Sequence, residues 1–459
     1  MDRLMLISAD CHWGLEPARY RPYVDSKYHS DFDQWLEHGP VPAAIHAEGN
    51  RRMAAAFGVT DPPLAGEQAE LAERLHEHFP DLAESEARDW IRESTNAFRP
   101  EISDPALRMK EMEADGVCAE IIIQQQGLPF FADAAQNQLD VIFDIPSNWD
   151  SISTELMMAG ARAYHRAVAD FVSAAPDRMI GLSTVPTLAD VDRAVEELTW
   201  AAEHGLRGVL VPADEIRRGL PPLYDQRYDR FWAACVDLNM PVHWHVGASP
   251  IRYGTSKHAG TVNGFEIFFW AHRPLWLMML GGVFGRHPGL KLVFTEQTVE
   301  WLPRALDAMD RRVEHVISSG NGLAPGNPGA PLPAKPSELW RSNCMMGASC
   351  MSREEALLAE GIGVETMMFG TDYPHQETVW PHSGAYINQV MKGLSEGDIR
   401  AMCGENAARA YGFDVEKLRP VAERIGHRME DVLDPQGPLA REAQKYPRAG
   451  RADRFGSTL

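Results

Sequence analysis

The chain has few cysteines for its length, and no two of them form a C-x-x-C pair. Six cysteines are scattered over 459 residues. Such a chain has no disulfide framework, so its cysteine usage indicates a reducing compartment. The N-terminus enters an apolar strand within four residues, without the basic and long apolar regions of a signal peptide. We therefore expect a cytoplasmic protein.

Long apolar runs and an excess of positive charge are also missing. The segment Phe265–Phe284 is broken by His272, Arg273 and Pro274, so no run approaches the length that spans a membrane. Lysine and arginine number 44 against 65 aspartates and glutamates, which gives a formal net charge of −21. This balance disfavours nucleic acid as a partner, because its phosphates need a basic surface.

Short apolar segments alternate with longer amphipathic ones through most of the chain. The amphipathic segments Leu156–Ala174, Asp190–Glu203 and Trp301–Val316 are typical of helices. The predicted strands are Leu4–Ala9, Ala119–Gln124, Met179–Val185, Gly208–Val211, Pro241–His245, Leu290–Thr295, Ser342–Met346 and Thr366–Gly370. Eight such units predict an α/β fold of the TIM-barrel type, with an open doubly wound sheet as the alternative. No glycine-rich nucleotide-binding motif follows any of these strands, so nothing supports a nucleotide-binding version of that sheet.

Two regions depart from this alternation. Residues from about 20 to 105 contain amphipathic runs, which predict a mainly helical insertion after the first strand. Because loops at the C-terminal ends of barrel strands carry the chemistry, we expect this insertion to shape the substrate pocket. The Gly- and Pro-rich segment 318–336 is expected to be a mobile loop. We assign residues 1–426 to the barrel and residues 427–459 to a tail that is disordered or wraps around a neighbouring subunit.

Three of the predicted strands end in residues that bind metals. Asp10 and His12 follow the first strand, His243 and His245 lie on the fifth, and Asp372 follows the eighth. Residues two apart on a strand face the same side, so the members of each pair point together. An aspartate and an imidazole from the first strand, one imidazole from the fifth and Asp372 make a four-ligand set. This mixture suits Zn²⁺, Mn²⁺, Fe²⁺ or Co²⁺ and leaves room for a bound water.

The sequence resembles the amidohydrolase superfamily, and more closely its branch related to aminocarboxymuconate-semialdehyde decarboxylase, often labelled amidohydrolase family 2. The segments that carry most of the resemblance are Asp10–Pro17 (DCHWGLEP), Pro241–Gly247 (PVHWHVG) and Phe369–Glu377 (FGTDYPHQE). The resemblance implies a distorted (β/α)₈ barrel with one divalent metal at the C-terminal ends of its strands, and zinc is our first choice. Relatives are often dimers, so we also expect a homodimer or a higher homo-oligomer.

Carried over position by position, the resemblance implies that Asp10, His12, His245 and Asp372 bind the metal. Asp372 would also move protons to or from the bound water. His243 then lies deeper in the barrel and is the second choice as a ligand.

Two positions depart from the family pattern. Asp10 stands where many members have a glutamate or a histidine, and Glu296 stands where decarboxylases of this branch have a catalytic histidine. Glu296 is therefore a candidate general acid or base, a partner for a cationic group, or an additional metal contact. The alternative is a buried glutamate paired with an arginine.

Further residues are candidates for the substrate pocket. The catalytic candidates are Asp372, Glu296 and His375, the last of which lies in the loop after the eighth strand. The candidates for substrate binding are Trp13, Glu16, Arg51, Arg52 and Glu377. The two arginines are included because a guanidinium group binds a carboxylate through two parallel hydrogen bonds.

These observations predict a hydrolase that depends on one divalent metal. In this reading, a metal-activated water attacks a small organic substrate that is carboxylated or aromatic. The alternative is metal-dependent, non-oxidative decarboxylation of an aromatic or unsaturated acid, with Asp372 protonating the carbon. A barrel that binds a metal or ligand without catalysis is an explanation of another class.

Overall fold

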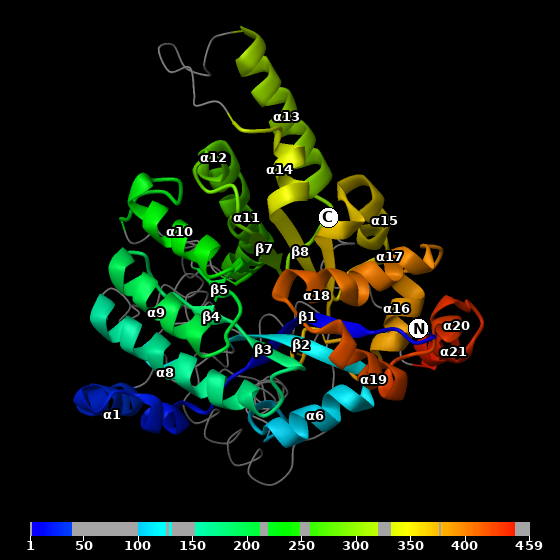
Figure 1. Cartoon of the computed structure of the whole chain (residues 1–459), viewed down its shortest axis with the longest axis horizontal. Helices are drawn as coiled ribbons and strands as arrows, with labels where there is room; N and C mark the ends of the chain where they lie inside the picture. The colour runs from blue at the N-terminus through cyan, green and yellow to red at the C-terminus, as the bar shows by residue number, and fades with distance from the viewer. Residues whose placement is uncertain are drawn as a thin grey trace.

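The computed structural model describes residues 2–38, 100–124, 128–130, 152–211, 219–247, 258–319, 332–375 and 378–445. Within these ranges, helices surround a central set of parallel strands (Figure 1). Most of the predicted insertion and most of the predicted mobile loop lie outside the described residues. No helix in the described ranges is long and apolar enough to cross a bilayer.

Each of the eight predicted strand regions contains a strand. The strands are β1 (Leu6–Trp13), β2 (Val117–Gln124), β3 (Met179–Gly181), β4 (Ser183–Thr184), β5 (Val209–Leu210), β6 (Val242–His245), β7 (Leu292–Thr295), β8 (Cys344–Ser349) and β9 (Met367–Gly370). The predicted strand Met179–Val185 is divided into β3 and β4 at Leu182. The N–H of Leu182 still donates to the carbonyl of Ile122 at 2.9 Å, so the chain continues along the same edge.

The strands form a closed ring. They pair in parallel in the orders β1-β2-β3 and β4-β5-β6-β7-β8-β9. The last strand then meets the first, because the N–H of Asp372 donates to the carbonyl of Asp10 at 3.0 Å and the N–H of His12 to that of Tyr373 at 2.7 Å. The TIM-barrel prediction is therefore confirmed, and the open sheet is wrong.

The predicted helices are confirmed within three residues at each end. They are α8 (Thr154–Ser173), α9 (Val191–Glu203) and α13 (Leu302–Ser319). The side chain of Asp190 accepts a hydrogen bond from the N–H of Arg193, which caps the start of α9.

Further helices complete the layer around the strands. Those before β8 are α1 (His29–His38), α5 (Pro100–Ser103), α6 (Pro105–Ala114), α10 (Asp229–Asp237), α11 (Ala259–Leu280), α12 (Val283–Arg286) and α14 (Pro336–Asn343). Those after β8 are α15 (Arg353–Ile362), α16 (Ser383–Val390), α17 (Glu396–Arg400), a π-helical turn at Ala401–Glu405, α18 (Asn406–Tyr411) and α19 (Val415–Ile425). Short 3₁₀ turns lie at Pro17–Tyr23, Ser26–Tyr28, Gln226–Tyr228 and Val364–Thr366.

Two apolar clusters divide the core. Ile121, Val293 and Met368 belong to a cluster that fills the interior of the barrel, whereas Trp244 and Phe294 belong to the cluster between strands and helices. Side chains alternate across a strand, so one chain segment serves both clusters. The apolar filling of the interior leaves the C-terminal ends of the strands to polar residues.

Residues 427–445 pack on the chain itself. They include α20 (Met429–Leu433) and α21 (Pro438–Lys445), and α21 contacts α16. Ala443 is buried against Ala385, and His382 Nδ1 lies 2.6 Å from Glu442 Oε1. In this part of the chain α21 packs on α16, whereas the assignment of residues 427–459 to a tail stays a prediction. Residues 446–459 lie outside the described ranges.

Candidate active site

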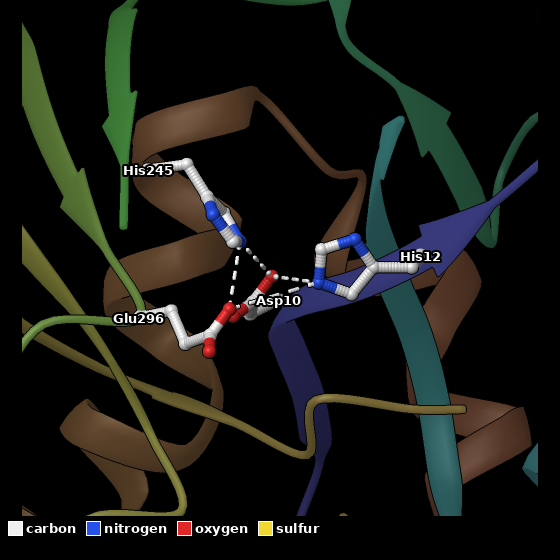
Figure 2. Close-up of side chains that lie close together, drawn as sticks. All are labelled: Asp10, His12, His245 and Glu296. Atoms are coloured by element: carbon white, nitrogen blue, oxygen red, sulfur yellow. Dashed lines mark ion pairs between the residues drawn. The ribbon is translucent and has the colours of Figure 1, made fainter. Parts of the chain in front are cut away.

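Six acidic and imidazole side chains meet at the C-terminal end of the barrel. They are Asp10, His12, His245, Glu296, Asp372 and His375. They form two overlapping groups that share His12 and Glu296, and the ligand atoms within each group lie within 4.8 Å of one another. Figure 2 shows one group, whose side chains point toward one another from β1, from β6 and from the end of β7. The side chains that we expected to meet, because each lies at or after the end of a strand, do lie close together.

The first strand presents two ligands together, and its register with β2 shifts beside them, between Ser8 and Cys11. Oδ1 of Asp10 lies 3.5 Å from Nε2 of His12 and 3.7 Å from Nε2 of His245. The Sγ atom of Cys11 instead contacts Ser8 Oγ at 3.1 Å. The short side chain of Asp10 thus reaches the cluster.

Both imidazoles of this group direct Nε2 to the centre. Nδ1 of His12 lies 3.2 Å from the carbonyl of Gln124, and Nδ1 of His245 lies 2.6 Å from the carbonyl of Val246. A carbonyl only accepts, so Nδ1 carries the hydrogen and Nε2 keeps the lone pair that a metal needs.

The atoms that face the centre are poorly satisfied without a cation. Asp10 Oδ1, His12 Nε2 and His245 Nε2 are buried and have no hydrogen-bond partner of normal geometry among the described residues. Buried polar atoms of this kind need an explanation, and a bound ion is one. The site therefore fits one divalent metal.

The protonation states of Asp10 and His12 agree with this fit. Burial acts to raise the pKa of Asp10, but its contacts with His245 and His12 outweigh burial and lower it to about 2. Burial, with the electrostatic effect of the neighbouring His375 ring, lowers the pKa of His12 to about 3. At neutral pH Asp10 is therefore an anion and His12 is neutral, which are the forms that bind a cation. Burial acts to lower the pKa of His245, but its contacts with Glu296 and Asp10 outweigh burial and raise the pKa well above its ordinary value, so a metal would displace the proton of this ring.

Asp372 follows β9 and contacts both His12 of the metal group and His375 of the loop beyond the strand. Its Oδ1 lies 3.2 Å from Nε2 of His12 and 2.9 Å from Nδ1 of His375. The ring of His375 stacks on that of His12, with the centroids 4.0 Å apart. The structure thus brings together the residues predicted to bind metal and to move protons, while their roles remain predictions.

Glu296 follows β7 and faces the same cluster. Its Oε2 lies 3.0 Å from His245 Nε2 and 4.0 Å from His12 Nε2. Within the described part of the chain its ion pairs are with these two histidines, so a pairing with arginine is not what the structure shows. Burial, with repulsion from Asp372, raises the pKa of Glu296 to about 7.

Two of these residues have backbones in the left-handed region. Glu296 has a φ of 51° and Asp372 a φ of 56°. Such a conformation in a residue with a Cβ costs on the order of 1–3 kcal/mol and persists where the surrounding structure imposes it. Glu296 directly follows β7 and Asp372 lies two residues after the end of β9, where the chain turns to aim each side chain into the site.

His243 lies one layer deeper than the cluster. Its Nδ1 lies 3.1 Å from Thr295 Oγ1, and its Nε2 lies 2.9 Å from the hydroxyl of Tyr411. Both ring nitrogens are therefore satisfied by the protein, and His243 is not free to bind a metal. The preference for His245 agrees with this geometry.

Two candidates for substrate binding lie away from the cluster. Trp13 is only 1% exposed and packs against Tyr20 and Phe171, on the helix side of β1. Glu16 is exposed just before the 3₁₀ turn at Pro17–Tyr23. Neither side chain joins the six clustered residues. Arg51, Arg52 and Glu377 lie outside the described residues.

Ser349 touches the site but was not among the predicted residues. It is the last residue of β8, and its hydroxyl donates a hydrogen bond to Oδ2 of Asp10. The predicted strand ended at Met346, although small and apolar residues continue to Ala348. Extending the strand through that run would have placed Ser349 at its end.

A buried ion pair supports the junction of β1 and β9. Arg108 Nε lies 2.7 Å from Glu120 Oε1, and Nη2 lies 3.1 Å from Oε2. The same guanidinium donates to the carbonyl of His12 at 3.3 Å and lies 4.2 Å from the centre of the Tyr373 ring. It therefore holds the backbone on both sides of the site.

Comparisons with known proteins agree with the fold and the ligand pattern. The Amidohydrolase family model matches residues 152–413, which is more than half of the chain. Gamma-resorcylate decarboxylase from Rhodococcus jostii (strain RHA1) is 27% identical over 274 residues, which cover 55% of this chain and 77% of that protein.

Two solved structures show the same fold. An amidohydrolase from Mycobacterium avium subsp. paratuberculosis K-10 has a TM-score of 0.58 and 20% identity, and the match covers 89% of this chain and 99% of that one. A dihydroxybenzoic acid decarboxylase from Polaromonas sp. JS666, solved with manganese and the inhibitor 2-nitroresorcinol, has a TM-score of 0.51 and 20% identity, covering 76% and 94%.

These comparisons correct the predicted hydrolase function, which is wrong because the curated relative that the chain matches is a decarboxylase. The sequence motifs identify metal ligands that suit both reactions, so they could not separate the two. A divalent metal is supported, whereas zinc in particular is not. By its motifs, its barrel and its family match, the chain belongs to amidohydrolase family 2, the branch related to aminocarboxymuconate-semialdehyde decarboxylase.

Proposed function

We propose that the protein is a metal-dependent, non-oxidative decarboxylase of a hydroxylated aromatic acid. The observation that carries this proposal is the similarity to gamma-resorcylate decarboxylase, which extends over 77% of that protein's length. The convergence of Asp10, His12 and His245 supports it, because this reaction needs a site that attracts a carboxylate.

Asp10, His12 and His245 would hold the metal, with Asp372 as a further oxygen donor. When bound, the ion supplies positive charge that orients the carboxylate of the substrate. Two carboxylates and two imidazoles suit Mn²⁺ as well as the zinc that we expected from the sequence, and we propose Mn²⁺ because the similar decarboxylase from Polaromonas sp. JS666 was solved with manganese. Elemental analysis of protein purified without chelators tests this choice.

Decarboxylation replaces a carboxylate on a ring carbon with a proton. The proton adds to that carbon, the bond to the carboxylate breaks, its electron pair returns to the ring and CO₂ leaves. Asp372 is placed to deliver the proton, since its Oδ1 contacts both His12 and His375. The side chain of His375 is 25% exposed, so it can return a proton from solvent to Asp372.

We assign Glu296 to the ring hydroxyl of the substrate. Because burial and Asp372 raise its pKa to about 7, this carboxyl group exchanges a proton readily near neutral pH. A carboxylate that takes the proton of a phenol adjacent to the reacting carbon increases the electron density there. The ring carbon then accepts the proton from Asp372 more readily.

A panel of benzoates tests the proposal. The protein loaded with Mn²⁺ is incubated with benzoates that carry a hydroxyl next to the carboxylate, and with the same compounds lacking that hydroxyl. We expect CO₂ and the corresponding phenol from the hydroxylated members only. Failure to release CO₂ from any member, by protein that has bound its metal, would contradict the proposal.

Two expectations from the sequence remain proposals. We propose a small-molecule substrate and a homodimer or higher homo-oligomer, and light scattering during gel filtration measures the second. The cytoplasmic location also remains a prediction.

A further inference from the structure

We propose that Ser349 is a positioning residue that fixes which oxygen of Asp10 faces the metal. This inference rests on the metal site of the proposed function. The hydroxyl of Ser349 donates to Oδ2 of Asp10, although 339 positions separate the two residues in the sequence. Within the described residues, Ser349 forms no hydrogen bond or ion pair with another member of the cluster, so it acts through Asp10.

The two oxygens of Asp10 have different surroundings. Oδ2 accepts the hydrogen bond from Ser349. Oδ1 has no hydrogen-bond partner of normal geometry among the described residues, and it faces Nε2 of His12 and Nε2 of His245. The serine therefore occupies one oxygen and leaves the other directed at the centre. Hydrogen bonds to a ligating carboxylate commonly fix its orientation in this way.

Gly370 makes the contact possible. It is the last residue of β9, and it pairs with Ser349 in the register of β8 and β9. A Cβ at position 370 would lie 2.8 Å from Cβ of Asp10 and 2.8 Å from Oγ of Ser349, closer than real Cβ contacts. A glycine therefore stands where the carboxylate and the hydroxyl need the space.

The strand pairing holds this arrangement in place. The N–H of Cys350 donates to the carbonyl of Gly370 at 3.1 Å, directly beyond Ser349. On the other side, the N–H of Asp372 donates to the carbonyl of Asp10. Ser349, Gly370 and Asp10 thus lie on the adjacent strands β8, β9 and β1. The hydrogen bonds between these strands hold the backbone at each of the three residues. A fixed serine on a fixed strand can orient a carboxylate, whereas a serine on a free loop cannot.

A purely structural role for Ser349 predicts a different outcome from a positioning role. If the hydroxyl only satisfied a buried carboxylate, its loss would reduce stability without a specific effect on the metal. If it positions Asp10, its loss weakens metal binding beyond what any change in stability explains. Metal affinity is thus the measurement that separates the two roles.

The experiment compares Ser349→Ala, Ser349→Thr and the control Ser183→Ala. Ser183 is a buried serine of β4 whose hydroxyl donates to the carbonyl of Gly208 at 2.9 Å, away from the metal group. The dissociation constant for Mn²⁺ is measured from the electron paramagnetic resonance signal of the free ion. We expect Ser349→Ala to bind Mn²⁺ about 10- to 100-fold more weakly than the wild type. Ser349→Thr, which keeps the hydroxyl, and Ser183→Ala should bind close to wild type.

The remaining outcomes overturn the inference in distinguishable ways. Wild-type protein that binds no Mn²⁺ or other divalent ion would remove the metal site, and with it both the proposed function and the role of Ser349. Wild-type protein that binds Mn²⁺, alongside a Ser349→Ala variant of equal affinity, would contradict the role of Ser349 alone. Should Ser349→Ala not fold, Ser349→Cys keeps the volume with a weak donor and carries the same expectation.

Discussion

Oε2 of Glu296 lies 3.0 Å from Nε2 of His245, across the C-terminal ends of the paired strands β7 and β6. The end of β7 therefore presents a carboxylate to the metal group, at the position where the family pattern led us to expect a histidine. An anion at this place can share a cation with His245 or take a proton from the substrate. The chemistry of this chain depends on which of these Glu296 does.

Replacing Glu296 with glutamine tests its part in the reaction. The change keeps the shape of the side chain and removes its charge and its capacity to accept a proton. We expect kcat to fall by about 10²-fold or more with Mn²⁺ at saturation. The control is Glu300→Gln, four residues further along and outside both metal groups. Equal kcat values for Glu296→Gln and the wild type would remove Glu296 from the mechanism.

Replacing Asp372 with asparagine removes the proposed proton donor. We expect kcat to fall by about 10²- to 10⁴-fold, because asparagine cannot transfer a proton. The substrate should still bind to the loaded protein, since Asp10, His12 and His245 are unchanged. Titration of a non-reacting substrate analogue checks binding, and product formation checks turnover. A variant with normal turnover would assign the proton to another group.

Removal of the metal should lower the melting temperature. Without a cation, the carboxylates of Asp10 and Glu296 both lie close to His245. The buried atoms Asp10 Oδ1, His12 Nε2 and His245 Nε2 then have no hydrogen-bond partner of normal geometry among the described residues. A ligand that binds only the folded state adds about 2.7 kcal/mol of stability at a concentration 100 times its dissociation constant. We expect a chelator to lower the melting temperature and added Mn²⁺ to restore it, as thermal unfolding would measure. An unchanged melting temperature in both steps would argue against a metal in the native site.

Asp115 should make the protein less stable as the pH rises. It is buried between α6 and α16, where it accepts hydrogen bonds from the N–H and hydroxyl of Ser383. Burial, with repulsion from Glu442, raises its pKa from 3.8 to about 7 despite these bonds. The folded state thus holds a proton that the unfolded state has already lost between these values. The contribution of Asp115 to the free energy of unfolding is therefore fully present below about pH 4, and it is lost as the pH rises through about 7.

The variant Asp115→Asn tests this dependence. Its amide stays neutral and can still accept from the N–H of Ser383, so it imitates the protonated acid. Urea unfolding at about pH 5 and about pH 8 compares the free energies of unfolding. We expect a smaller difference between the two pH values in the variant than in the wild type. The side chains of His382, His427 and Glu442 lie nearby and are the same in both proteins, so the two proteins differ only at position 115. An unchanged difference would show that Asp115 is ionised throughout.

The sequence predicted the barrel and its ligands because both depend on local patterns. Apolar runs and amphipathic segments place each strand and helix, and the pairs Asp10/His12 and His243/His245 appear within a few residues of a strand end. The choice of His245 over His243 came from the family pattern. The structure adds its physical reason, since Thr295 and Tyr411 already occupy both nitrogens of His243.

Contacts between distant parts of the chain were not predictable from spacing. Ser349 meets Asp10 only because β8, β9 and β1 close the ring, and Arg108 reaches Glu120 from a neighbouring helix. The type of reaction was also out of reach. Hydrolysis and decarboxylation use the same ligands, and the difference lies in which group donates a proton to which substrate atom.

The fate of the substrate in deuterated water tests the central claim most directly. Protein loaded with Mn²⁺ is incubated in D₂O with a benzoate that carries a hydroxyl next to its carboxylate, and the products are analysed by mass spectrometry and NMR. The account predicts equal amounts of CO₂ and phenol, with one deuterium on the carbon that lost the carboxylate. A product that retains its carboxylate, or one with an oxygen at that carbon, would contradict it.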